Sequence, residues 1–143
     1  MLRIVVDTNI WIRILLRGRL TLPVLTAWQA GKFQLITSQA LLDEYEAVWQ
    51  RPRLQKQIDP KQAEKLYRQM YFRAEMVELK TIPPRCRDPK DHPVLATAID
   101  GQANVIVTGD DDLRADEELR RAMANYGVQL WGVQSLFDAI EDR

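Results

Sequence analysis

The sequence is poor in the residues that build disulfides and zinc sites. Its 143 residues include one cysteine, Cys86, and one histidine, His92. A lone cysteine cannot form an internal disulfide, so it favours a reducing, cytoplasmic setting. A zinc site is not expected, because such sites draw several ligands from cysteine and histidine. No apolar run approaches the ~20 residues that a membrane helix needs, so no membrane partner is expected.

Three common catalytic motifs are also missing. The chain contains neither G-x-x-x-x-G-K-[ST] nor G-x-G-x-x-G, the usual phosphate-binding loops for nucleotides and dinucleotides. It has no G-x-S-x-G turn, which would present a serine nucleophile. The sequence therefore gives poor support to these three kinds of site.

Charge is balanced in total but not along the chain. The net charge is zero, yet residues 1–87 hold 15 Lys/Arg against 8 Asp/Glu, and residues 88–143 hold 5 against 12. Such asymmetry fits a basic surface for a polyanion beside an acidic, metal-binding pocket. Unevenly charged, solvated helix faces would explain it equally well.

Short apolar runs alternate with helical segments along the chain. Strands are expected over residues 2–7, 33–38, 76–82, 104–110 and 127–133, and helices over residues 8–16, 22–31, 39–52, 60–75, 94–103 and 134–142. Several strand runs lack polar alternation, which indicates strands buried on both faces. The pattern predicts an α/β fold with a mostly parallel sheet of about five strands and helices on both faces.

Acidic residues follow two of these strands. Asp7 ends the first strand, Asp110 ends a later one, and Asp88 and Asp91 precede a helix. Ligands of open α/β sheets bind beyond the carboxyl ends of the strands, where these residues are expected. Aspartate is also a favoured helix N-cap. A cap alone would account for Asp91 and is plausible for Asp7.

Three consecutive aspartates need more than a cap. Asp110, Asp111 and Asp112 stand together, and one cap satisfies only one helix start. Two unit charges ~4 Å apart repel by about 4 kcal/mol at an effective dielectric near 20. Either some carboxyl pKa values rise or a cation binds. Hard oxygen ligands suit Mg²⁺ or Mn²⁺.

Glu44 is a further candidate on the helix expected over residues 39–52. An apolar stripe at helical spacing consists of Leu41, Leu42, Tyr45, Val48 and Trp49. Glu44 flanks that stripe and is able to reach the rim of a cleft. Glu46 borders the other side, and a plain surface carboxylate is the default for both.

Four segments then occur in a specific order. They are VVDTNIWI (5–12), SQALLDEYEAVWQRPRL (38–54), RDPKDHPVLATAI (87–99) and VIVTGDDDL (105–113). Together they closely resemble the PIN-domain ribonucleases, in particular the VapC-like toxins of bacterial toxin–antitoxin pairs. The resemblance covers nearly the whole chain and implies a single PIN-like domain over residues 1–143 with a three-layer α/β/α architecture.

The resemblance also implies roles for individual residues. The catalytic, metal-binding quartet would be Asp7, Glu44, Asp91 and Asp110, with Asp112 as a further metal ligand. The supporting residues would be Thr8, Asn9, Thr108 and, as an outer member or cap, Asp88. Asp111 has no role in the family pattern and is expected to face solvent. Candidate RNA-binding residues are Arg13, Arg17, Arg51, Arg53, Arg85 and Arg87.

The implied activity is that of an endoribonuclease. One or two Mg²⁺ or Mn²⁺ ions would activate a water for in-line hydrolysis of RNA, leaving a 5′-phosphate and a 3′-hydroxyl. A toxin of a type II pair would bind a small antitoxin, and homodimers are common among such toxins. One alternative is a non-catalytic RNA- or partner-binding module. Another is a flavodoxin-like phosphoacceptor domain, which requires an acidic pair after the first strand and a lysine after the last.

Overall fold

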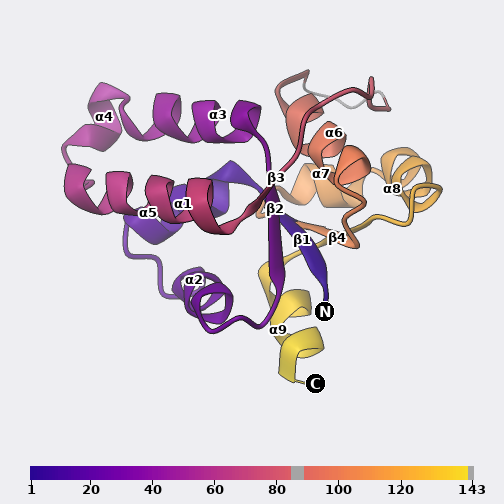
Figure 1. The fold of residues 1–143 in the computed structure, drawn as a ribbon, viewed down its shortest axis with the longest axis horizontal. Helices are drawn as coiled ribbons and strands as arrows, with labels where there is room; N and C mark the ends of the chain where they lie inside the picture. Colours follow the sequence, from indigo (N-terminus) through magenta and orange to yellow (C-terminus); the bar gives the residue numbers. More distant parts are fainter. Residues whose placement is uncertain (85–88, 142–143) are drawn as a thin grey trace.

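The computed structural model describes residues 1–84 and 89–141 and shows a five-stranded sheet (Figure 1). The strands are β1 (Arg3–Val6), β2 (Gln34–Thr37), β3 (Glu75–Met76), β4 (Val105–Val107) and β5 (Gln129–Trp131). Their order is β3-β2-β1-β4-β5, and every neighbouring pair is parallel. The predicted α/β fold with about five parallel strands is confirmed.

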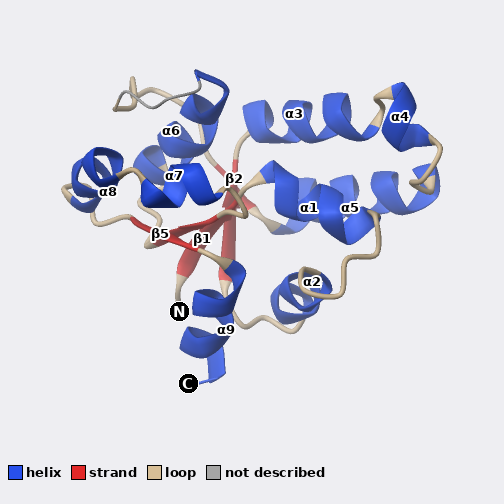
Figure 2. Cartoon of the chain, turned by 180° about the vertical axis from the view of Figure 1, so that it is seen from behind, coloured by secondary structure: helices blue, strands red, loops and turns tan. Residues whose placement is uncertain are grey.

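Helices cover both faces of the sheet (Figure 2). They are α1 (Thr8–Leu15), α2 (Leu22–Gln29), α3 (Gln39–Trp49), α4 (Pro52–Gln55), α5 (Pro60–Arg73), α6 (His92–Asp100), α7 (Asp111–Ala115), α8 (Glu117–Ala124) and α9 (Val133–Glu141), with a 3-10 turn η1 (Pro89–Asp91) before α6. Gly31 has φ +74° just after α2, so it supplies the left-handed residue that commonly follows a helix end.

The alternation of side chains along the strands divides the core into two clusters. Ile4 and Val6 of β1 pack on one face, in a cluster with residues of α1, α2, α5 and α9. Val5 points to the other face and packs with residues of α6, α7 and α8. There are two clusters because successive strand residues face opposite sides of a sheet. Each cluster is buried by the helices on its own side. The result is three layers, with the sheet in the middle.

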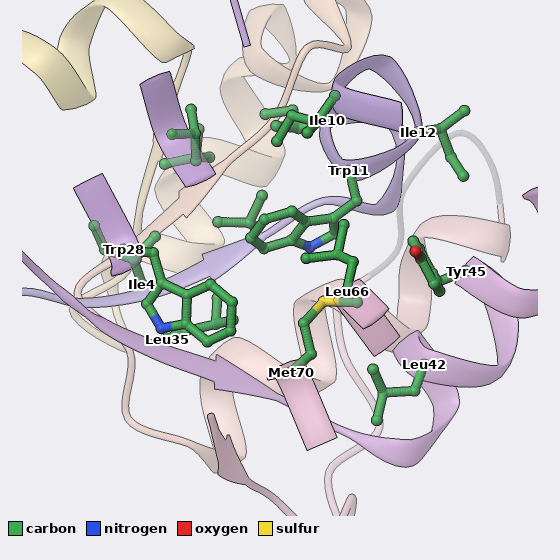
Figure 3. Packing of buried hydrophobic residues seen from close by; sticks show 14 of the residues in the cluster. Ile4, Ile10, Trp11, Ile12, Trp28, Leu35, Leu42, Tyr45, Leu66 and Met70 are labelled. Carbon is green, nitrogen blue, oxygen red and sulfur yellow. The ribbon is translucent and has the colours of Figure 1, made fainter. Parts of the chain in front are cut away.

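The larger cluster is built around two tryptophans (Figure 3). Trp11 of α1 and Trp28 of α2 meet edge to face, with ring centroids 5.9 Å apart. Leu35 of β2 and Met70 of α5 are buried in the same cluster. Complete burial of one such apolar side chain contributes about 1.5–3 kcal/mol. This packing holds α1 in place, and α1 begins at the candidate site.

Several elements differ from the sequence prediction. The strand expected over residues 76–82 is only Glu75–Met76, and the chain leaves the sheet after it. Helix α3 ends at Trp49, near Pro52 as expected, and Pro52 begins the short α4, where proline fits the first helical turn. The helices α7 and α8 were missed. Their first turns are rich in acidic residues, which the sequence argument treated only as site candidates.

The strand order also bears on one alternative. A flavodoxin-like sheet has the order 2-1-3-4-5, whereas this sheet runs 3-2-1-4-5. The flavodoxin-like interpretation is therefore wrong for this chain. In the described part of the protein, no helix is both long and apolar enough to cross a membrane.

Candidate active site at the carboxyl edge of the sheet

The order in which the chain adds strands to the sheet reverses between β1 and β4, and this is the topological switch point of the fold. From β1 the chain builds outward through β2 and β3, and then it returns to the other side of β1 as β4. Ligands of such sheets bind in the crevice at this switch, beyond the carboxyl ends of the strands. Asp7 follows β1 and Thr108 follows β4. The backbone N–H of Asp7 donates to the Val107 carbonyl at 2.9 Å, which fixes the two strand ends side by side.

Thr108 connects the polar groups at this point. Its hydroxyl donates to Asp7 Oδ2 at 2.7 Å and accepts from the backbone N–H of Asp110 at 3.1 Å. Thr108 is fully buried, so its bond to Asp7 lies away from water, whereas the bond from Asp110 is only partly buried. Nearby, the Gly109 N–H donates to Asn9 Oδ1 at 3.5 Å. The loop after β4 is thus bound to the start of α1 by side chains on both segments.

Asp7 is a buried carboxylate. Its exposed fraction is 8%, and burial raises the pKa of its carboxyl above the usual range. The Thr108 hydrogen bond and the charge of Arg13 act against that rise, whereas the charge of Asp110 adds to it. Asp7 stands at the N-cap position of α1, but its side chain makes no capping hydrogen bond. The cap interpretation therefore does not explain why a carboxylate is buried here.

Asp110, by contrast, is a true helix cap. Its Oδ1 accepts the backbone N–H groups of Asp112 at 2.9 Å and Leu113 at 3.2 Å, at the start of α7. Asp111 is exposed and forms an ion pair with Arg114, as expected for a solvent-facing residue. Asp112 is also exposed. The three consecutive aspartates thus have three different environments.

Glu44 reaches the same region from α3. This helix is capped by Ser38, whose hydroxyl accepts the Leu41 N–H at 3.4 Å and contacts Thr97 Oγ1 of α6 at 2.8 Å. Glu44 is half-buried, and burial raises the pKa of its carboxyl, as do the charges of Asp7 and Asp91. The charges of Asp7 and Asp91 thus act on Glu44, which places its carboxyl in the same acidic region.

These side chains line a cavity of about 370 Å³. Its lining residues are Asp7, Thr8, Asn9, Ile12, Arg13, Glu44, Val48, Arg51, Lys90, Asp91 and Asp110. All four members of the expected acidic quartet are among them.

Asp91 stands at the N-cap position of α6 without a side-chain capping bond, so the cap account given for it is wrong.

A comparison with protein-family models agrees with this architecture. The model of the PIN domain matches residues 3–112, well over half of the chain. The chain belongs to the PIN-domain family. PIN domains are generally nucleases, and they typically use divalent metal ions. A comparison with curated proteins gave no match.

The PIN domain brings together only some of the predicted residues. Arg13 and Arg51 line the acidic cavity, whereas Arg17 and Arg53 are exposed and do not. Asp112 is not among the lining residues either. Arg85, Arg87 and Asp88 lie outside the described residues. Lys90 lines the cavity but was not predicted; its place beside Asp91 in the DPKDHP segment was the only signal for it.

The carboxylates at this site are the kind of ligand that a hard divalent ion prefers. Their side chains are not arranged as a metal-binding site. The quartet offers carboxylate oxygens, which Mg²⁺ and Mn²⁺ prefer. The buried Asp7 carboxylate has neighbouring acidic charges and makes no helix-capping bond. Within residues 1–84 and 89–141, however, no three His, Cys, Asp or Glu side chains converge closely enough to hold an ion. The residues fit the ion by chemistry, and ion binding requires their side chains to move together.

Proposed function

We propose that this PIN domain is a Mg²⁺- or Mn²⁺-dependent endoribonuclease and the toxin of a type II toxin–antitoxin pair. The observation that carries the nuclease proposal is the buried Asp7 carboxylate at the β1/β4 switch point, in one cavity with Glu44, Asp91 and Asp110. Burying a charge is unfavourable unless a partner compensates it. A divalent ion is the partner that the surrounding acids favour.

Each side chain has a role in this proposal. Asp7, Glu44, Asp91 and Asp110 hold the ion, and Asp112 is a further ligand. The bound ion would supply an activated water and stabilise charge during in-line hydrolysis to a 5′-phosphate and a 3′-hydroxyl. Thr108 orients Asp7 through its hydrogen bond, as groups behind metal ligands commonly do. The Thr8 side chain lies close enough to Glu44 to lower the pKa of its carboxyl, against the effect of burial.

Cations in the lining of the cavity support RNA as the substrate. Arg13, Arg51 and Lys90 line the same cavity as the four acids. Lysine and arginine that face phosphates supply much of the affinity for nucleic acids. A cavity that combines carboxylates with basic residues is suited to a phosphodiester bridged to a metal ion.

The toxin assignment rests on the resemblance of the four motifs to VapC-like proteins. It implies a small antitoxin that covers the acidic cavity, and a homodimer of the toxin. Growth tests address it directly. Expression of the wild-type chain alone should arrest growth, and Asp7→Asn should relieve the arrest. A harmless wild type that nevertheless cleaves RNA in vitro would remove the toxin assignment and leave the nuclease.

The nuclease assignment is tested with purified protein. Asp7→Asn keeps the size of the side chain but removes its charge, so we expect Mn²⁺-dependent cleavage of single-stranded RNA to fall by about a hundredfold or more. Asp43→Asn is the matched control, because Asp43 is exposed on α3 and does not line the cavity. Cleavage by Asp7→Asn at the wild-type rate would disprove the proposal.

A non-catalytic RNA- or partner-binding module is the second candidate. The observation in its favour is that the described acids do not converge as a metal site. Calorimetric titration with Mn²⁺ distinguishes the two candidates. Binding that is lost in Asp110→Asn supports the nuclease, whereas no heat of binding at millimolar Mn²⁺ supports the module.

A further inference from the structure

Arg13 is a cation placed inside the acidic cavity by the fold itself. It lies in the last turn of α1, six residues after Asp7, and it lines the cavity together with Asp7, Glu44 and Asp110. Its charge acts directly on Asp7, where it opposes the rise of the carboxyl pKa. Arg13 therefore belongs to the same electrostatic unit as the acids.

The position of its guanidinium depends on Gly109. A Cβ atom at residue 109 would overlap the guanidinium of Arg13, which packs against the glycine backbone. Gly109 lies between Thr108 and Asp110, so this contact brings the positive charge next to the loop that carries Asp110. Because the overlapping atoms are the far end of a flexible side chain, a methyl group at residue 109 would displace the guanidinium and leave the backbone in place.

Packing, rather than a salt bridge, holds the guanidinium there. Among the described residues, Arg13 forms no ion pair with a carboxylate; the ion pairs are Arg3–Glu75, Arg114–Asp111 and Arg121–Glu117. A guanidinium held by packing alone balances nearby charge without being fixed to one acid. An incoming divalent ion has no ion pair to break when it displaces the guanidinium, but it must overcome its charge.

We propose that Arg13 is a built-in counter-cation of the acidic cavity, which competes with the divalent ion and so sets its affinity. This inference rests on the proposed metal-dependent function. In the metal-free protein the guanidinium compensates part of the charge of Asp7 and Asp110. A divalent ion that enters must overcome its repulsion, so the protein binds metal more weakly than its four acids alone would.

The test measures Mn²⁺ affinity rather than activity. Arg13→Gln removes the charge from an exposed side chain, and we expect Mn²⁺ to bind about tenfold more tightly by calorimetry at low salt. The difference should shrink at ~1 M salt, where screening is strong. Arg19→Gln is the control, because Arg19 is exposed and does not line this cavity. It should bind Mn²⁺ like the wild type.

Gly109→Ala provides an independent second variant. It keeps every charge but moves the guanidinium away, so it should also tighten Mn²⁺ binding, and it should have no further effect in the Arg13→Gln background. Unchanged or weaker Mn²⁺ binding by folded Arg13→Gln and Gly109→Ala would overturn the inference while leaving the metal site itself intact. No Mn²⁺ binding by the wild type would instead overturn the proposed function.

Discussion

Thr108 Oγ1 lies 2.7 Å from Asp7 Oδ2, so the residue that follows β4 holds the carboxylate that follows β1. The same hydroxyl accepts the Asp110 N–H at 3.1 Å. The buried Thr108 hydroxyl thus orients both the Asp7 carboxylate and the loop that carries Asp110. Its removal should affect stability and cleavage together.

The Thr108→Val variant tests this relationship. Valine has nearly the same shape but no hydroxyl, so it leaves Asp7 Oδ2 and the Asp110 N–H without this partner. We expect a loss of about 1–3 kcal/mol in the free energy of unfolding, measured by urea denaturation. Cleavage should fall by about 10- to 100-fold. Thr26→Val, at an exposed position on α2, should change neither. Full cleavage by Thr108→Val would show that the hydroxyl is not needed to orient Asp7.

A matched pair of glutamates tests the orientation of α3. Glu44 lines the cavity, whereas Glu46 on the same helix accepts a hydrogen bond from Gln50 Nε2 at 3.0 Å and does not line it. Glu44→Gln should abolish most Mn²⁺-dependent cleavage, because it removes one carboxylate ligand. Glu46→Gln should cleave RNA at close to the wild-type rate. Equal losses of RNA cleavage in both variants would mean that cleavage depends on α3 as a whole and not on the Glu44 carboxylate.

The consecutive aspartates after Asp110 are also expected to differ. Asp112 is proposed as a further metal ligand, while Asp111 is exposed and paired with Arg114. Asp112→Asn should weaken Mn²⁺ binding in calorimetry, and Asp111→Asn should not. The described structure leaves Asp112 outside the lining of the cavity, so its contribution requires a movement of the α7 start. Identical Mn²⁺ affinities for the two variants would remove Asp112 from the ligand set.

Asp100 gives a pH prediction away from the cavity. Burial alone would raise the pKa of its carboxyl, but hydrogen bonds from the Lys80 N–H at 2.6 Å and from Thr81 outweigh it and lower the pKa below its usual value. A carboxyl with a depressed folded pKa stabilises the fold above its unfolded pKa, and this contribution is lost as pH falls through the folded pKa. Asp100→Asn should therefore lower the free energy of unfolding at pH 7.

The expected loss is at most about 1 kcal/mol, because solvent screens this partly exposed site. The difference between Asp100→Asn and the wild type should disappear in strongly acidic solution, where both side chains are neutral. Urea denaturation at neutral and acidic pH measures it. A difference that stays constant with pH would show that the Asp100 charge contributes nothing.

The sequence predicted the elements whose signals are local. The run 2–7 became β1, and the segment 60–75 became α5 with Pro60 in its first turn. The segment 76–82, in which apolar and polar residues alternate, misled the prediction. Strand β3 pairs only through Glu75 and Met76, and strand pairing depends on a partner that no local pattern contains.

The sequence predicted which acidic residues line the cavity, but not the hydrogen bonds that they make. Motifs indicated Asp7 and Asp110, and both line the cavity. Asp110 caps α7, whereas Asp7 makes no capping bond and accepts a hydrogen bond from Thr108, which lies 101 residues away along the chain. The contact between Arg13 and Gly109 is equally non-local, since it joins α1 to the loop after β4. Such contacts follow from the pairing of β1 with β4 and not from either segment alone.

The pairing of β1 with β4 has a consequence for the order of events on the ribosome. Residues 1–76 contain three strands and five helices, but the cavity does not exist until Val105–Val107 have emerged and inserted beside β1. Contacts of such long sequence separation form late, because the loop between their ends must be closed first. A nascent chain that ends before Val105 therefore lacks the paired strand ends, and the finished acidic cavity arises only after β4 and Asp110 have been made.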